Sequence, residues 1–156
     1  MGHVLTLEQW QVKAKDIRKN RKHLVFTNGC FDILHVGHVR YLQQARQLGD
    51  LLMVGLNSDS SVKKLKGESR PVQCEEDRAE ILSALQCVDF VILFDEETPL
   101  SLIQQIQPDI LVKGGDWSVE KIVGSNFVLS RGGQVQSLPF HPGRSTSLIL
   151  KKVLAG

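Results

Sequence analysis

The chain has 156 residues and a formal net charge of +2, with 42% hydrophobic and 23% charged residues. These values are typical of a globular protein, and the length suits one domain with its own core, so we expect a single domain over residues 1–156. No apolar run approaches the ~20 residues of a membrane span, and the amino terminus lacks a secretory signal. The small charge gives no indication of nucleic acid as a partner. Three cysteines without a CxxC spacing favour a reducing, cytoplasmic setting over disulfides or zinc.

The hydrophobic pattern predicts helices and strands that alternate along the chain. Thr6, Ser58, Thr98 and Ser145 stand where helix N-caps are expected. Residues 65–74 are polar, contain a glycine and a proline, and are predicted to form a loop. The expected helices are 6–20, 36–49, 58–64, 75–85, 98–106, 120–131 and 145–155, and the expected strands are 23–28, 51–57, 88–94, 109–115 and 133–140.

The predicted strands are continuous apolar runs, which is typical of a parallel sheet covered on both faces. With right-handed crossovers this predicts an α/β fold with a doubly wound, five-stranded parallel sheet. Sheets of this kind bind ligands at the carboxyl ends of their strands, near the point where the strand order reverses.

The stretch "TNGCFDILHVGH" (27–38) leads from the first long strand into a helix. His35 and His38 are three residues apart and so share one face of the first helical turn, and Gly37 leaves room between them. A helix N-terminus favours anions, so the pattern predicts a phosphate site. A lone histidine here would usually be a surface residue or a cap. Zinc is disfavoured because no further ligands have suitable spacing.

Several longer strings resemble one family. They are "FTNGCFDILHVGHVRYLQQARQLGD", "VGLNSDSSVKKLKGESRPV", "DRAEILSAL", "VDFVILFDEETPLSLI" and "PDILVKGGDW". Together they are similar to the adenylyltransferases of ADP-heptose synthesis, within the HxGH cytidylyltransferase-like superfamily, over roughly residues 6–154. The resemblance implies a Rossmann-like nucleotidyltransferase fold. In many bacteria this enzyme is fused behind a sugar kinase, for which the chain has no room, so we expect the stand-alone form.

The resemblance also implies the reaction. AMP would pass from ATP to D-glycero-D-manno-heptose 1-phosphate, giving ADP-heptose and pyrophosphate for surface-glycan synthesis. The implied catalytic residues are His35, His38 and Lys66. The implied nucleotide-binding residues are Asn28, Cys30, Phe31, Gly37, Gly114, Asp116, Gly143, Ser145 and Thr146. The implied binding residues for the sugar phosphate are Asp32, Lys63, Arg70, Lys113 and Trp117.

Some roles stay open at this point. Asp32 could orient a histidine, position the acceptor phosphate, or stabilise its turn. Arg78 could be catalytic or could form an ion pair on its helix. Trp117 could stack on the ligand or pack, and Ser145 could bind phosphate or simply cap its helix. Cys30 is not expected to be a nucleophile, because the transfer needs no covalent step.

ATP would carry Mg²⁺ on its phosphates, because no carboxylate cluster suggests a dedicated cage. The expected partners are ATP and a sugar 1-phosphate, in a homodimer by resemblance. The nearest rival is a cytidylyl- or adenylyltransferase for another polyol phosphate, such as glycerol 3-phosphate. A non-catalytic nucleotide sensor and a nucleic-acid binder are more distant alternatives.

Overall fold

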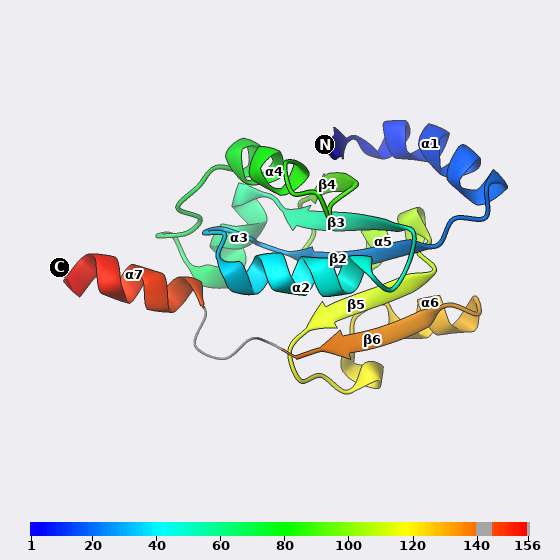
Figure 1. Ribbon diagram of the computed structural model, residues 1–156. Coiled ribbons are helices and arrows are strands. Elements are labelled where there is room, and N and C mark those ends of the chain that lie inside the picture. Colours follow the sequence, from blue (N-terminus) through cyan, green and yellow to red (C-terminus); the bar gives the residue numbers. More distant parts are fainter. Residues whose placement is uncertain (140–144, 156) are drawn as a thin grey trace.

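The structure is a computed structural model that describes residues 1–139 and 145–155. Its centre is a parallel sheet of six strands in the order β1-β4-β3-β2-β5-β6 (Figure 1). The doubly wound parallel sheet is therefore confirmed, with one strand more than predicted. The strands are β1 (His3–Leu5), β2 (Leu24–Gly29), β3 (Leu51–Asn57), β4 (Phe90–Phe94), β5 (Ile110–Gly114) and β6 (Gln134–Leu138).

The sixth strand is β1, which pairs with β4 at the edge of the sheet. Its three residues are too few to show a hydrophobic period, so the sequence gives no sign of it. The helices are α1 (Leu7–Lys19), α2 (Val36–Arg46), α3 (Asp59–Lys66), α4 (Glu75–Ser83), α5 (Leu100–Ile106), α6 (Ser125–Ser130), α7 (Thr146–Ala155) and the 3₁₀ turn η1 (Val119–Lys121).

Local signals placed most helix starts correctly. Thr6 caps α1 in a capping box with Gln9, and Ser58 caps α3 by accepting from the N–H of Ser61. The prediction that Thr98 caps α5 is wrong, because the cap position is held by Pro99.

The single helix predicted over 120–131 is also wrong. The chain forms η1 and α6 instead, and Gly124 separates them with a φ of +87°. A Cβ on Gly124 would lie 2.7 Å from Ile103 Cδ1, so close packing and the left-handed backbone both favour glycine there.

The sheet is covered by helices on both faces, as Figure 1 shows. On one face, α1, α5 and α6 pack over side chains such as Phe26, Met53 and Leu111. On the other face, α2 and α4 pack over the strand residues next in sequence, such as Val25 and Val54. Successive strand residues thus alternate between two cores, which explains why the strands are apolar throughout. Among the described residues, no helix combines the length and apolar character needed to cross a bilayer.

The strand order reverses between β2 and β5. These two strands pair in register at only two positions, Val25 with Ile110 and Phe26 with Leu111. In contrast, β2 and β3 stay paired up to Gly29 and Leu56. The sheet therefore opens between the carboxyl ends of β2 and β5, where doubly wound folds bind ligands.

Candidate active site

A cavity of about 800 Å³ lies at the carboxyl ends of the strands. Figure 1 shows α3 and α7 at this end of the sheet, and residues of both helices line the cavity. It brings together most of the side chains predicted from sequence, drawn from four separate segments. Those that line it are Asn28, Cys30, Phe31, Asp32, His35, Gly37, His38, Lys66, Arg70, Lys113, Gly114, Ser145 and Thr146.

His35 and His38 form a stacked pair on the cavity wall. Their ring centroids are 3.9 Å apart and their planes differ by 24°. His35 is the N-cap of α2, and its Nδ1 accepts a 3.1 Å hydrogen bond from the N–H of Gly37. The amide of Gly37 is therefore bonded within the helix start. The neutral His35 ring must carry its proton on Nε2, which makes Nε2 a donor.

The imidazole pair is uncharged near neutral pH. Burial lowers the pKa of His38 to about 4, with smaller contributions from His35 and Lys66. Burial also lowers the pKa of His35. In the described part of the structure, Nδ1 of His38 is buried without a hydrogen-bond partner. Two neutral imidazoles can thus donate to an anion, and gain a proton if a strong negative charge settles beside them.

The loop before α2 is held in a strained form that sets the ring of Phe31 against His38. Phe31 has a φ of +43°, and its ring meets the ring of His38 edge-on at 5.2 Å. Gly29 permits this approach, because a Cβ there would lie 2.9 Å from Phe31 Cε2. Positive φ at a bulky residue costs energy and is found mainly where the surrounding fold enforces it.

Three cationic side chains reach the cavity from different elements: Lys66 from the end of α3, Arg70 from the following loop, and Lys113 from the end of β5. Arg70 is paired with Asp32, whereas Lys66 and Lys113 belong to none of the ion pairs found among residues 1–139 and 145–155. Lys113 is half-buried, and burial lowers its pKa. A half-buried cation with no carboxylate partner is suited to an anionic ligand.

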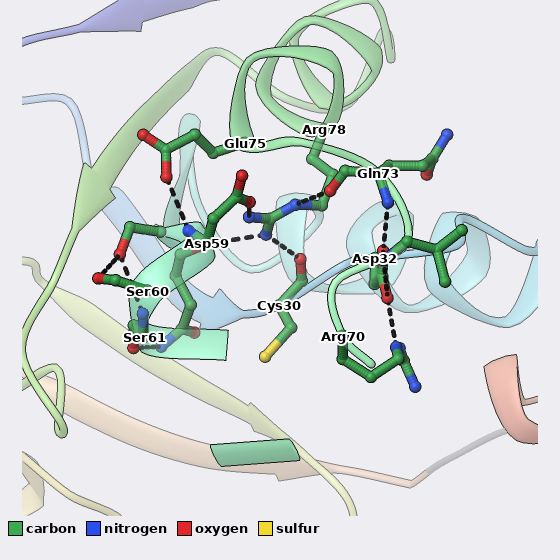
Figure 2. A network of polar contacts seen from close by, with 12 residues as sticks. Cys30, Asp32, Asp59, Ser60, Ser61, Arg70, Gln73, Glu75 and Arg78 are labelled. Atoms are coloured by element: carbon green, nitrogen blue, oxygen red, sulfur yellow. Dashed lines mark hydrogen bonds and ion pairs between the residues drawn. The ribbon is translucent and has the colours of Figure 1, made fainter. Parts of the chain in front are cut away.

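Asp32 holds the loop that follows α3, residues 67–73, which we call the lid loop. Its carboxylate accepts from the N–H of Val72 at 2.8 Å and of Gln73 at 3.0 Å, and pairs with Arg70 Nε at 2.5 Å (Figure 2). Burial alone would raise the pKa of Asp32, but these donors outweigh burial and lower it. These partners lie in the lid loop, 38 to 41 residues away, so the contacts differ from the stabilisation of its own turn that the sequence left open.

Arg78 lies behind the cavity wall and does not line it. Its side chain is fully buried and is ion-paired with Asp59 at 2.7 Å. The same guanidinium donates to three main-chain carbonyl oxygens, those of Cys30, Asn57 and Gln73 (Figure 2). Arg78 does form an ion pair, as one of the two open roles expected, but its partner Asp59 lies on α3 and not on the helix of Arg78. The contacts also give Arg78 a wider part, joining two strand ends to the lid loop.

The start of α7 closes another side of the cavity. Ser145 Oγ accepts from the N–H of Leu148 at 3.2 Å, and Thr146 Oγ1 donates to the carbonyl oxygen of Ile33 at 3.3 Å. Ser145 thus acts as an ordinary cap while it also lines the cavity. Gly143, predicted to bind the nucleotide, lies outside the described residues.

Three predicted residues do not line the cavity: Lys63, Asp116 and Trp117. All three side chains are exposed. Trp117 is 48% exposed, and its indole N–H donates to the carbonyl oxygen of Gly114 at 3.1 Å. Their roles toward a ligand stay predictions.

Other cavity residues were missed by the sequence reasoning. Glu97, Thr98 and Pro99 follow the carboxyl end of β4, a position that the switch-point rule could have indicated. Tyr41 lies one helical turn after His38, so helical spacing could have indicated it as well. Among the described residues, those missed are Gly29, Tyr41, Asn57, Leu65, Glu97, Thr98, Pro99, Val123 and Ser147.

The fold and the position of this cavity define a doubly wound α/β protein with a ligand site at the switch point of its sheet. A family model described as Cytidylyltransferase-like matches residues 26–150, and the chain belongs to that family. A curated relative, Bifunctional protein HldE of Citrifermentans bemidjiense, is 61% identical over 134 residues, or 86% of this chain. The chain spans only 28% of that relative's length.

Two solved structures are also similar. The lipopolysaccharide core biosynthesis protein from Thermoplasma volcanium has a TM-score of 0.60 and 29% identity, and the match covers 77% of this chain and 97% of that one. Pantoate-beta-alanine ligase from Francisella tularensis, solved in complex with beta-gamma ATP and beta-alanine, has a TM-score of 0.64, and the match covers 94% of this chain and 69% of that one. Its 13% identity extends the likeness to the fold alone.

Proposed function

We propose that the protein is an adenylyltransferase that transfers AMP from ATP to D-glycero-D-manno-heptose 1-phosphate, giving ADP-heptose and pyrophosphate. The observation that carries the proposal is the stacked, neutral pair of His35 and His38, which faces a cavity with three cationic side chains. A triphosphate is the substrate whose charge this set of donors matches.

The chemistry requires positioning more than acid–base catalysis. An oxygen of the sugar 1-phosphate attacks the α-phosphorus in line, one P–O bond forms, and the bond between the α-phosphorus and the bridging oxygen breaks. The electron pair of that bond leaves with pyrophosphate. The nucleophile is already an anion, so no side chain has to remove a proton from it. His35, His38 and Lys66 stabilise the charge that grows on the leaving group.

Lys113 and Arg70 are proposed to hold the acceptor phosphate. Lys113 is half-buried at the end of β5, on the side of the switch point opposite to the loop of Cys30. Arg70 is fixed by Asp32 through Nε, so its two terminal nitrogens stay available for a phosphate. An acceptor phosphate held there would have to place its attacking oxygen on the side of the α-phosphorus opposite to the leaving pyrophosphate, as an in-line displacement needs.

Mg²⁺ is proposed to enter on the oxygens of ATP. The described cavity residues include two carboxylates, Asp32 and Glu97. Both carboxylate oxygens of Asp32 already accept hydrogen bonds from N–H groups. Glu97 could meet water of the hydrated ion. When bound, the ion would neutralise phosphate charge and favour departure of pyrophosphate.

The acceptor is proposed from likeness. The strings quoted above resemble adenylyltransferases of ADP-heptose synthesis, and a relative with 29% identity bears the name of a lipopolysaccharide core biosynthesis protein. A cytoplasmic homodimer is proposed on the same resemblance. All three cysteines are free thiols in the described structure, which fits the reducing conditions of the cytoplasm.

The test is a matrix of nucleotides and acceptors. The protein is incubated with Mg²⁺, each of ATP, CTP, GTP and UTP, and either heptose 1-phosphate or glycerol 3-phosphate, and pyrophosphate release is measured. We expect ATP with heptose 1-phosphate to be the best pair by about 10²-fold or more in kcat/KM, which is below the ~10⁴-fold that unpaired buried polar groups can give. A better rate with CTP and glycerol 3-phosphate would assign the protein to the rival activity.

A further inference from the structure

The phenol of Tyr41 lies where the sheet opens between β2 and β5. Its hydroxyl is 2.6 Å from Thr27 Oγ1 on β2 and 3.4 Å from the carbonyl oxygen of Val112 on β5. These contacts come directly after the last paired positions of the two strands, Phe26 and Leu111. The hydroxyl thus connects the two strands just beyond their last paired positions.

The direction of the hydrogen bonds follows from the groups present. The phenol has one proton, and a carbonyl oxygen can only accept, so Tyr41 donates to Val112 and Thr27 donates to Tyr41. Thr27 is fully buried and Tyr41 is 7% exposed, so water cannot replace either bond freely. Burial raises the pKa of Tyr41 to about 12, which keeps the phenol protonated over the range in which an enzyme works.

The three elements joined here each carry part of the proposed site. Tyr41 is on α2, one turn after His38. Thr27 precedes Asn28 on β2, and Val112 precedes Lys113 on β5. A shift of β5 away from β2 would therefore move Lys113 relative to the imidazole pair, and displacements of about 1 Å in such sites can reduce rates by up to ~10²-fold.

We infer that Tyr41 is a positioning residue, whose hydroxyl fixes the gap between the ends of β2 and β5 and thereby the distance of Lys113 from His35 and His38. Its effect on catalysis depends on the function proposed above. Its effect on the two strands does not depend on that function.

The test uses Tyr41→Phe, which keeps the ring and removes the hydroxyl. The matched control is Ser83→Ala, which removes another buried hydroxyl, one that donates to the carbonyl oxygen of Glu80 at 2.8 Å on α4. Hydrogen exchange of residues 110–114 is measured by mass spectrometry on the free protein. We expect about tenfold faster exchange there in Tyr41→Phe and no change in Ser83→Ala.

Steady-state kinetics then test the consequence for catalysis. Tyr41→Phe should lower kcat about tenfold and leave KM for ATP within about threefold, because binding groups stay and the reacting groups shift. In a Lys113→Met background the same substitution should change kcat by less than about twofold, because the group that it positions is gone.

Each outcome decides the inference. Unchanged exchange at 110–114 in Tyr41→Phe overturns it, and so does an equal loss of kcat with and without Lys113. Suppose that Tyr41→Phe speeds exchange at 110–114 but the wild-type protein transfers no nucleotide to any acceptor. The contact between the strands would then be supported, and the proposed function would be refuted.

Discussion

Arg78 donates a hydrogen bond of 2.6 Å to the carbonyl oxygen of Cys30, which joins helix α4 to the loop that carries the candidate nucleotide site. The same guanidinium reaches the carbonyl oxygens of Asn57 at 2.8 Å and Gln73 at 3.0 Å. One fully buried cation therefore holds the ends of two strands and the lid loop together. Carbonyl oxygens turned toward this cation cannot be satisfied by water, so its removal should be costly.

The first prediction concerns Arg78→Lys. An ammonium group cannot reach four acceptors arranged around a planar guanidinium, so we expect a loss of ~3–5 kcal/mol in the free energy of unfolding. Urea denaturation monitored by circular dichroism measures this loss. The control is Arg46→Lys, whose partner Asp89 and whose own side chain are both partly exposed, with an expected loss below ~1 kcal/mol. Equal losses in the two variants would contradict the bridging role.

The imidazole pair gives the second prediction. His35→Ala and His38→Ala should each lower kcat by ~10²-fold or more, because each removes a donor that acts on the charge of the transition state. Pyrophosphate release with ATP and heptose 1-phosphate is the assay, and circular dichroism checks that the variants fold. The exposed His23 serves as control, since His23→Ala removes an imidazole at the other end of β2. Near-normal turnover in either active-site variant would remove that histidine from the mechanism.

The third prediction is a dependence of stability on pH. The pKa of His38 is about 4 in the folded protein, below its ordinary value of 6.5. The unfolded chain therefore binds more protons between these values, and the free energy of unfolding falls as pH drops from 6.5 toward 4. His38→Gln should flatten this part of the profile relative to the wild type. Denaturant melts at a series of pH values measure both, and parallel profiles for wild type and His38→Gln would refute the assignment.

The fourth prediction concerns proton uptake on binding. A triphosphate beside His35 and His38 should raise pKa values that burial has lowered, so binding of ATP with Mg²⁺ at about pH 5.5 should take up protons. Isothermal titration calorimetry in two buffers of different ionisation enthalpy measures the number. The double variant His35→Gln, His38→Gln should bind ATP with little uptake. Uptake that persists in this variant would place the phosphates away from the pair.

Asp32 gives the fifth prediction. Oδ1 accepts from the N–H groups of Val72 and Gln73, and Oδ2 accepts from Arg70 Nε and from Val72 N–H. In Asp32→Asn one of these two oxygens becomes an NH₂ group that faces N–H donors. We expect amide exchange at residues 72–73 to rise by about tenfold or more. The control is Asp109→Asn, which removes a carboxylate that accepts from Leu24 N–H at 2.8 Å and should leave the lid loop unchanged. A lid loop equally protected in both variants would show that Asp32 does not hold it.

The layered α/β fold followed from periodicity, because strands buried on both faces are apolar throughout and amphipathic helices separate them. The stacked position of His35 and His38 also follows from local sequence, since residues three apart on a helix share a face. Strand β1 and the break at Gly124 were missed because three residues carry no period and because the packing of Gly124 against Ile103 involves a distant segment.

Only the tertiary structure decided which cationic side chains line the cavity. Lys63, Lys66, Arg70 and Arg78 are all plausible phosphate ligands by composition, yet Lys63 is exposed outside the cavity and Arg78 is buried behind it. The physical reason is that each position depends on acceptors far away in sequence, such as Asp32 for Arg70 and Asp59 for Arg78. The sequence by itself determined the layered sheet and the chemistry at its first long strand. Ion pairs between residues far apart in sequence determined which cationic side chains lie at that site.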